Sequence, residues 1–233
     1  MVFVPAARRL FMPSGYNLRM PHSSISNPGG PALAGADDIL QFWLGAVRPS
    51  NADALQQRQQ WFTKSDAFDA EMRQRFGATV QAAVDGQLGD WAGEPWGRLA
   101  LVLLLDQFTR NVYRGGPQAF AGDRRALELA LGAIESGMDL HLPEVLRIFV
   151  YLPLEHAEDP AMQRRSVLAF AALAQSAGND PDLAEFLQGT LDYAWRHQEV
   201  IARFGRFPHR NALLERASTP EELHYLSQPG AGF

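Results

Sequence analysis

The sequence predicts an all-α fold in which helices stack antiparallel within a single domain. Apolar residues recur every three or four positions along most of the chain, which is the spacing of one helix face. Acidic caps, prolines at helix starts and glycines at helix ends separate these segments. No alternating strand pattern competes with them, and 233 residues, 46% of them hydrophobic, can bury a full-sized core.

Start and stop signals follow one another in the first half of the chain. They predict a helix after the acidic cap Asp37 and Asp38 that ends near Gly45, one over residues 52–62 after the turn at Pro49, one from the cap Ser65 to Gly86, and one from Trp96 to Gly115 and Gly116. Each carries apolar side chains at helical spacing, so we expect each to bury that face.

The same signals continue in the second half. They predict a helix over residues 122–136 stopped by Gly137, one opened by Pro143, one starting at Asp159 and Pro160, one from Asp180 and Pro181 to Gly205, and a short one capped by Thr219 and Glu222. In the helix opened by Pro143, Pro153 removes a backbone hydrogen bond and should kink or break it.

The ends of the chain differ from this helical pattern. Residues 1–35 are rich in proline, glycine and serine, so we expect a disordered or loosely attached extension there, a helical domain over residues 36–227, and a flexible tail over residues 228–233. Arg8 and Arg9 precede too short an apolar run for a secretion signal, and no segment has the roughly 20 apolar residues that cross a membrane. We expect a cytoplasmic protein without membrane contact.

Composition excludes several classes of function. The chain has no cysteine, which rules out disulfides, thiolate metal sites and cysteine nucleophiles and fits a reducing compartment. A net charge of −5 without a basic stripe argues against nucleic acid as a partner. Phosphate-binding, dinucleotide-binding, nucleophile-elbow and HExxH strings are all missing, so we predict no cofactor.

Residues 99–114 are the predicted centre of the fold. Seven apolar residues lead from Leu99 directly into a polar end formed by Asp106, Gln107, Arg110 and Asn111. A helix that is apolar all round is buried on all sides, so these polar groups must be satisfied by protein, water or ligand. Two interpretations are open: an Asp106–Arg110 ion pair with a Gln107–Asn111 amide ladder, or a ligand-binding site.

A second cluster comprises Glu155, His156 and Glu158, just after Pro153. These groups could form a general acid and base set or a hard-metal site, or simply a solvated acidic helix end. Di-iron helix bundles take a Glu-x-x-His motif from each of two helices, and the string here is Glu-His-x-Glu. We therefore predict no metal, and regard Glu155 and His156 as candidate catalytic residues.

His197 lies on the apolar side of its predicted helix. A lone histidine in such a position is a core residue with one hydrogen bond or, in the company of other titratable groups, a proton-transfer residue. A close approach to His156 or Asp106 would favour the second interpretation.

The third cluster is the loop with Arg206, His209, Arg210 and Asn211. It alternates aromatic and polar residues around glycine and proline. Planar guanidinium groups there can hold a carboxylate or phosphate, or can only neutralise the end of the preceding helix.

Several strings resemble one known family. LLLDQFTRNVYRG, QAFAGDRRALELA, VYLPLEHAED and RHQEVIARFGRFPHRNALLERASTPEE, with FWLG and WFTKSDAFDAEMRQRF before them, are similar to bacterial proteins of unknown function grouped as DUF924. The resemblance covers roughly residues 37–226 in the same order. It implies a tetratricopeptide-like helical stack, a right-handed superhelix, and brings no established activity.

The resemblance extends to the candidate residues of all three clusters and to His197. The chain departs from the family pattern at three positions, where the family usually has proline for Thr109, serine for Ala157 and glycine for Glu215. Loss of the serine hydroxyl argues against residue 157 as a nucleophile.

Two functions are compatible with these residues. The first is a binding module that holds a small anionic molecule or a peptide end in a polar pocket, using Asp106, Gln107, Arg110, Asn111, Glu158, Arg206, His209, Arg210 and Asn211. The second is a small hydrolase or metal-assisted enzyme. In it Glu155, Glu158 and Asp106 act as ligands or base, and His156 or His197 transfers protons. Convergence of these side chains on one cavity would support a site, whereas separate backbone partners for each would weaken both hypotheses.

Overall fold

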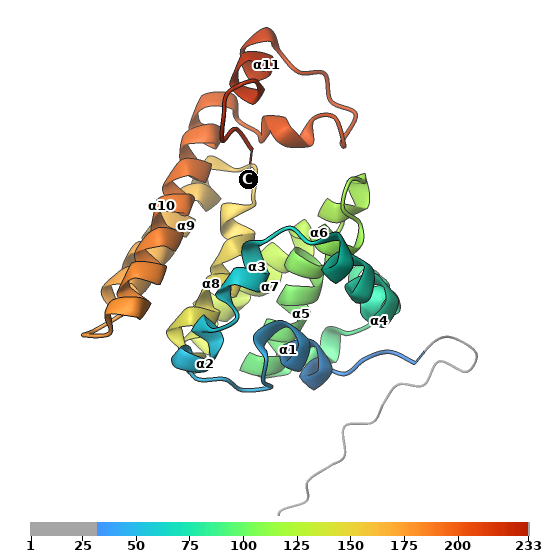
Figure 1. Cartoon of the computed structure of the whole chain (residues 1–233), viewed down its shortest axis with the longest axis vertical. Helices are drawn as coiled ribbons and strands as arrows, with labels where there is room; N and C mark the ends of the chain where they lie inside the picture. Colours follow the sequence, from blue (N-terminus) through green and yellow to red (C-terminus); the bar gives the residue numbers. More distant parts are fainter. Residues whose placement is uncertain (1–31, 233) are drawn as a thin grey trace, which may run out of the picture.

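The computed structural model describes residues 32–232, and all regular structure in that range is helical (Figure 1). The α-helices are α1 (Ala36–Leu44), α2 (Asn51–Leu55), α3 (Arg58–Phe62), α4 (Asp66–Val84), α5 (Pro95–Val102), α6 (Thr109–Val112), α7 (Asp123–Ser136), α8 (Glu144–Glu155), α9 (Pro160–Gln175), α10 (Pro181–Phe204) and α11 (Pro220–Leu226). The all-α prediction is therefore confirmed. The tetratricopeptide-like superhelix stays a prediction from the family resemblance.

The predicted extension and tail of the chain are described only in part. Most of the expected extension, residues 1–31, lies outside the described residues. Ahead of α1, the backbone N–H of Ala34 donates to the Thr79 hydroxyl of α4 at 2.9 Å. At the other end, Gly232 lines a large cavity, so the chain returns to the body of the molecule after α11.

The central helix is built from three consecutive pieces. α5 leads into a π-helical stretch, Leu103–Phe108, and α6 completes the helix. Every residue from Leu99 to Leu105 is at most 1% exposed, as expected for a helix that is apolar all round. The polar end of the helix starts inside the π-helical stretch, at Asp106.

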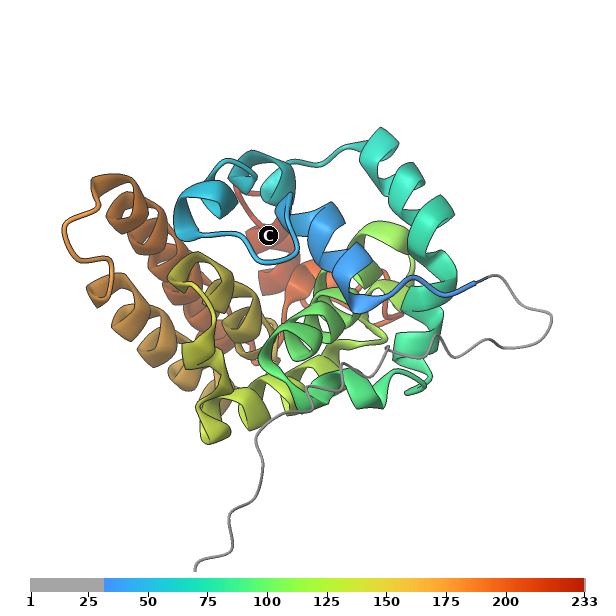
Figure 2. The ribbon, with the colours of Figure 1, turned by 90° about the horizontal axis from the view of Figure 1, so that it is seen from below.

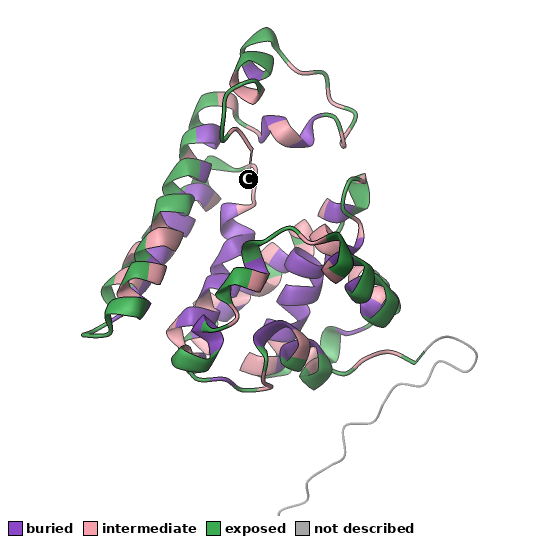
Figure 3. Cartoon of the chain, viewed as in Figure 1, coloured by how far each residue is buried: buried purple, intermediate pink, exposed green. Residues whose placement is uncertain are grey.

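Other helices surround this central one on several sides. α1, α7 and α8 pack against α5, and α4 packs against α6 and the π-helical stretch. Figure 3 shows α5 and α8 as the most continuously buried helices. The core residues of α8 include Val145, Leu146 and Phe149, which lie in the same hydrophobic cluster as the central helix.

α9 and α10 form a long antiparallel pair on one flank of the molecule. They pack closely along their length, and α9 also packs against α8 (Figure 1). Figure 2 shows this pair and α4 on opposite flanks, with the central helix between them. α10 in turn packs against α8.

The predicted caps account for most helix boundaries. Ser65 accepts a hydrogen bond from the N–H of Phe68 at the start of α4, and Asp159 accepts from the N–H of Ala161 at the start of α9. Gly45 and Gly205 adopt left-handed backbone conformations, with φ of 78° and 70°, directly after α1 and α10. These are the positions where glycine relieves the Cβ clash.

Two local expectations differ from the structure. The single helix expected over residues 52–62 is two short helices, α2 and α3, with a turn at Gln56 and Gln57. The turn lets the Trp61 indole N–H donate to the backbone oxygen of Trp43 at 2.7 Å. α8 also continues through Pro153 to Glu155 without a break, since the proline removes only one hydrogen bond close to the helix end.

Within residues 32–232, no helix combines the length and the apolar character that a membrane crossing requires.

Candidate functional site

A cavity of about 1040 Å³ lies between the central helix, α8 and α10. Its lining combines apolar side chains, among them Trp61, Phe170 and Phe186, with a set of polar and charged ones. Such a mixture of apolar walls and a few convergent polar groups is typical of small-molecule sites.

Most of the residues singled out from the sequence lie in this cavity. Its lining includes Gln107, Arg110, Asn111, Glu155, His156, His197, His209 and Arg210. They come from the central helix, the end of α8, α10 and the 3₁₀ turn Pro208–Arg210. The fold therefore brings the three sequence clusters and His197 together.

Asp106 lies beneath the cavity wall and holds three of its side chains in place. The carboxylate is 1% exposed, and its Oδ1 atom lies 2.7 Å from His156 Nδ1 and 3.2 Å from Arg110 Nη1. Gln107 donates to Oδ2 at 2.6 Å. The Asp106–Arg110 ion pair is thus present, whereas Gln107 bonds to Asp106 and Asn111 bonds to Asp69 instead of forming an amide ladder.

The partners of Asp106 fix the protonation states of this group. Burial alone would raise the pKa of Asp106, but the charge of Arg110 and the hydrogen bond from His156 outweigh it and hold the pKa well below its usual value. Burial lowers the pKa of His156, although Asp106 opposes this effect. A neutral His156 that donates from Nδ1 to the carboxylate presents an unprotonated Nε2.

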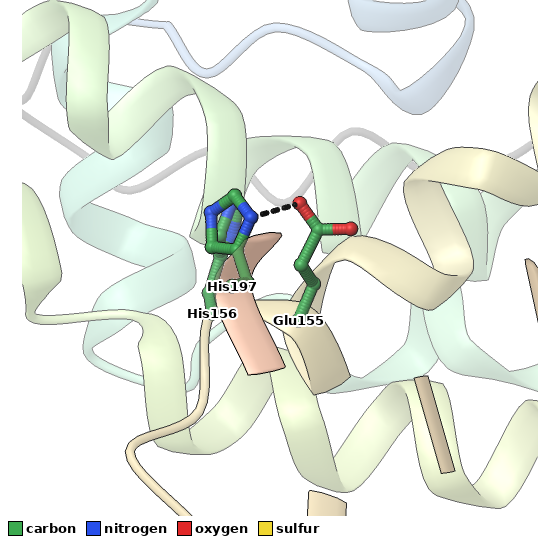
Figure 4. Close-up of side chains that lie close together, drawn as sticks. All are labelled: Glu155, His156 and His197. Atoms are coloured by element: carbon green, nitrogen blue, oxygen red, sulfur yellow. Dashed lines mark ion pairs between the residues drawn. The ribbon is translucent and has the colours of Figure 1, made fainter. Parts of the chain in front are cut away.

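Glu155, His156 and His197 form a compact cluster at the end of α8 (Figure 4). Glu155 Oε1 lies 3.0 Å from His197 Nδ1, and the two imidazole rings are 6.0 Å apart between centroids. His197 Nδ1 also lies 2.9 Å from the backbone oxygen of Tyr193. A carbonyl oxygen only accepts, so Nδ1 of His197 carries a proton in this arrangement.

Gln163 of α9 holds the end of α8 in position. Its side chain is fully buried, and its amide donates to the backbone oxygens of Glu155 at 2.6 Å and Ala157 at 2.8 Å. The carbonyl of Glu155 has no partner within α8, because a helix leaves its last carbonyls unpaired. The contact fixes the backbone that carries Glu155 and His156.

Arg110 and Arg210 form a cationic pair in the cavity wall. Both pair with Asp123 at the start of α7, Arg110 Nη1 at 2.9 Å and Arg210 Nη1 at 3.2 Å. Both guanidinium groups also lie over the ring of Phe120, at 5.9 Å and 4.8 Å from its centroid. Arg110 Nη2 and Arg210 Nε are buried without a hydrogen-bond partner in the described structure.

Burial and nearby positive charges lower the pKa values of Arg210 and His209. Burial, with the charge of Arg110, lowers the pKa of Arg210 to about 10, so it stays cationic at neutral pH. Burial, with the charge of Arg210, lowers the pKa of His209 to about 4, which leaves it neutral at the same pH. The two arginines therefore supply the positive charge of this wall.

Three of the predicted residues are held by partners near the loop and α11, outside the cavity lining. Glu158 accepts two hydrogen bonds from Arg216, at 2.6 and 2.9 Å, and one from the N–H of Phe207. Arg206 pairs with Glu222 at 2.7 Å, and Asn211 donates to the same carboxylate at 3.3 Å. These contacts connect α11 to the loop after α10.

Sequence reasoning missed Asp123 as a member of the site. An acidic residue at the first position of a helix is expected to complement the helix dipole, and Asp123 occupies that position in α7. Only the fold shows that its carboxylate also bridges Arg110 and Arg210. Phe120, which lies under both guanidinium groups, was missed for the same reason.

The chain is similar to bacterial proteins of unknown function, both in sequence and in structure. A family model described as a bacterial protein of unknown function, DUF924, matches residues 39–230. A solved structure of a protein of unknown function from Agrobacterium tumefaciens, ATU0120, is similar with a TM-score of 0.68 and 39% identity, covering 82% of this chain and 96% of that one. No curated protein matches the chain.

Proposed function

Since this chain belongs to DUF924, a bacterial family of unknown function, we propose its function from the site itself: the protein binds a small anionic molecule or a peptide end in the cavity. The observation that carries the proposal is the pair Arg110 and Arg210 in the cavity lining, each of which has one buried donor nitrogen without a hydrogen-bond partner in the described structure.

The unmatched donor nitrogens of this pair favour an anion. Arg110 and Arg210 both pair with Asp123. Asp106 Oδ1 contacts both Arg110 and His156. Buried guanidinium nitrogens without a partner destabilise the protein, and a carboxylate or phosphate accepts from them in a planar, charge-assisted geometry. An anion therefore satisfies the donors that the protein leaves unmatched.

The rest of the lining indicates the kind of anion. Trp61 and Phe186, with ring centroids 6.4 Å apart, and the side chains of Ile148 and Leu152 give the same cavity an apolar lining. We propose that the ligand carries an apolar body next to its anionic group, since burial of that body adds about 25 cal/mol per Å².

Ligand-induced stabilisation tests this proposal. Inorganic phosphate, hexanoate and a short peptide with a free carboxylate are titrated while the thermal unfolding midpoint is measured. At least one probe should raise the midpoint of the wild type, with hexanoate more effective than phosphate. Arg210→Gln should weaken the affinity by roughly tenfold or more, because a charge-assisted hydrogen bond is lost.

Two further variants make the result specific. Arg110→Lys keeps the charge next to Asp106 but loses the planar fork, so it should also weaken binding. Arg124→Gln removes an arginine whose side chain is 91% exposed, and should bind like the wild type. Equal affinity in all three variants, or no response of the wild type to any probe, would overturn the proposal.

A hydrolytic enzyme is the second candidate function. The Asp106–His156 hydrogen bond at 2.7 Å favours it, because the pair presents an imidazole base to the cavity. The expected result is that wild-type protein hydrolyses a member of an ester and phosphoester panel and that His156→Ala does not. Identical turnover by both proteins would argue against this role.

A further inference from the structure

Glu155, His156 and His197 bring three potential metal-ligand atoms together at one end of the cavity lining. One carboxylate oxygen and one nitrogen of each ring lie within 4.8 Å of one another (Figure 4). Ligands of a tetrahedral zinc ion lie about 3.4 Å apart, from Zn–N bonds near 2.0–2.1 Å. Glu155 Oε1 lies 3.0 Å from His197 Nδ1, which carries a proton, so Nε2 is the nitrogen of His197 that is available to a metal.

The carboxylate of Glu155 gives an independent reason to expect a ligand. Glu155 is 3% exposed, and its Oε2 atom is buried without a hydrogen-bond partner among the described residues. A buried carboxylate oxygen with no donor destabilises a protein unless a donor or a cation satisfies it. Its position beside two imidazole rings makes a metal cation a suitable partner.

Both histidines have a hydrogen-bond acceptor on the ring atom that would face away from a metal. Asp106 accepts from His156 Nδ1, and the backbone oxygen of Tyr193 lies 2.9 Å from His197 Nδ1. Metal-binding histidines almost always have a carboxylate or a carbonyl in this role, since it fixes the tautomer and orients the ring. Gln163 fixes the backbone of Glu155 in addition.

From this arrangement we infer that Glu155, His156 and His197 bind one divalent first-row transition metal ion, with Zn²⁺ the expected ion. Two imidazoles and one carboxylate are a ligand set of zinc enzymes, and three protein ligands leave a coordination position open. All three residues line the cavity, so that position faces it.

From the sequence alone, no metal is expected at the end of α8. The string Glu-His-x-Glu lacks the Glu-x-x-His spacing of di-iron bundles, but the structure recruits His197 from α10 as the third residue. Glu158, the second glutamate of the string, pairs with Arg216 instead.

The metal site and the proposed anion site can be tested separately because they use different side chains. The chelator-treated full-length protein is titrated with Zn²⁺ alone, and bound metal is measured by calorimetry and elemental analysis. We expect one Zn²⁺ per chain. Glu155→Gln and His197→Gln should each lower the affinity at least 100-fold, and Asp106→Asn 10- to 100-fold as a residue that only orients His156.

Control variants distinguish this cluster from other histidines. His224→Gln changes an exposed side chain, and His209→Gln changes another histidine of the same cavity; both should bind Zn²⁺ like the wild type. Arg210→Gln should retain Zn²⁺ binding while losing the response to anions. Equal Zn²⁺ affinity in Glu155→Gln, His197→Gln and the wild type would overturn the inference.

If the variants at buried positions fail to fold, a measurement on the wild-type protein still tests the site. Co²⁺ in a site of two nitrogens and one carboxylate with an open position gives visible absorption bands that are stronger than those of the hydrated ion. We expect these bands at one equivalent of Co²⁺ and their loss on addition of one equivalent of Zn²⁺. A spectrum identical to that of hydrated Co²⁺ would refute the site.

Discussion

Gly122 lies directly against the backbone carbonyl group of Leu105, in the π-helical stretch of the central helix. A Cβ atom at position 122 would lie 2.2 Å from the Leu105 oxygen and 2.8 Å from its carbonyl carbon. Both are backbone atoms, which cannot rotate away as a side chain can. The start of α7 therefore reaches the π-helical stretch because position 122 carries no side chain, and Asp123, the next residue, reaches Arg110 and Arg210.

Gly122→Ala should destabilise the protein by about 2 kcal/mol or more, as overpacking against a rigid neighbour does. The matched control is Gly77→Ala in α4, where an added Cβ meets nothing within 4 Å. That variant should be neutral or stabilise by roughly 0.5–1 kcal/mol, because alanine is the better helix former. Urea unfolding curves of both variants check the prediction, and equal effects at the two positions would contradict it.

The place of the central helix could be predicted from the sequence, but its local geometry could not. Seven apolar residues ahead of Asp106 require burial on all sides, whatever surrounds them. The same uniform apolarity hides the π-helical stretch, since a run that is apolar at every position has no period that distinguishes a wider turn. The predicted hydrogen bond between the Gln107 and Asn111 amides is not formed. Gln107 donates to Asp106 instead, and Asn111 donates to Asp69.

Most candidate residues of the site could be identified from the sequence, but which of them lie together in the fold could not. Glu155 and His156 are adjacent, and chain order says nothing about His197, which α10 carries past the end of α8. Helix periodicity places His197 on a buried face, but it does not predict which residues of other helices lie next to it. The bridge from Asp123 to Arg110 and Arg210 depends on how α7 meets the loop after α10, which is tertiary information.

A buried ion pair and an exposed one share the same spacing in this chain. Asp106 and Arg110, four residues apart, have 1% and 20% exposed side chains, and Glu71 and Arg75, also four apart, have 50% and 49%. Asp106→Asn should lower the free energy of unfolding by about 3 kcal/mol, since it leaves buried partners uncompensated. Glu71→Gln should change it by less than about 0.5 kcal/mol.

Chemical denaturation of the two variants at neutral pH and moderate salt measures this contrast. Added salt should reduce the small effect at Glu71 and leave the effect at Asp106 almost unchanged, because buried charges are screened much less. Similar losses of stability at both positions would show that the Asp106 network contributes no more than a surface pair.

Glu215 has a backbone φ of 54°, a left-handed conformation that among the described residues is otherwise adopted by glycines. The family resemblance seen in the sequence implies glycine at this position. Glu215→Gly should therefore raise the free energy of unfolding by about 1 kcal/mol, by removing the clash of Cβ with the backbone. Glu215→Ala keeps the Cβ and should not, so a gain of the same size in Glu215→Ala would assign the effect to loss of the charge instead.

Glu222 connects α11 to the loop after α10. Its side chain is 2% exposed and accepts hydrogen bonds from Arg206 Nε at 2.7 Å and from the N–H of Thr219 at 2.7 Å. The hydrogen bonds from Arg206 are the main cause that lowers the pKa of Glu222 to about 2. In an unfolded chain a glutamate has a pKa of about 4.3. The native state therefore favours the ionised form.

This difference determines how stability should depend on pH. The contribution of Glu222 is fully present above about pH 5, where both states are ionised, and is lost as the pH falls towards 2, where the folded state also takes up the proton. Glu222→Gln removes the titration, so its deficit in unfolding free energy relative to the wild type should be largest at pH 6 and should shrink steadily between pH 5 and pH 3.

Urea unfolding of the wild type and Glu222→Gln at pH 6, 5, 4 and 3 tests this expectation. Glu221→Gln is the matched control, because the neighbouring Glu221 is 62% exposed and pairs with the exposed Arg203 at 2.9 Å. Its difference from the wild type should be small at every pH, as for other surface pairs. A deficit in Glu222→Gln that stays constant down to pH 3 would mean that the side chain acts through packing and capping, with no contribution from its charge.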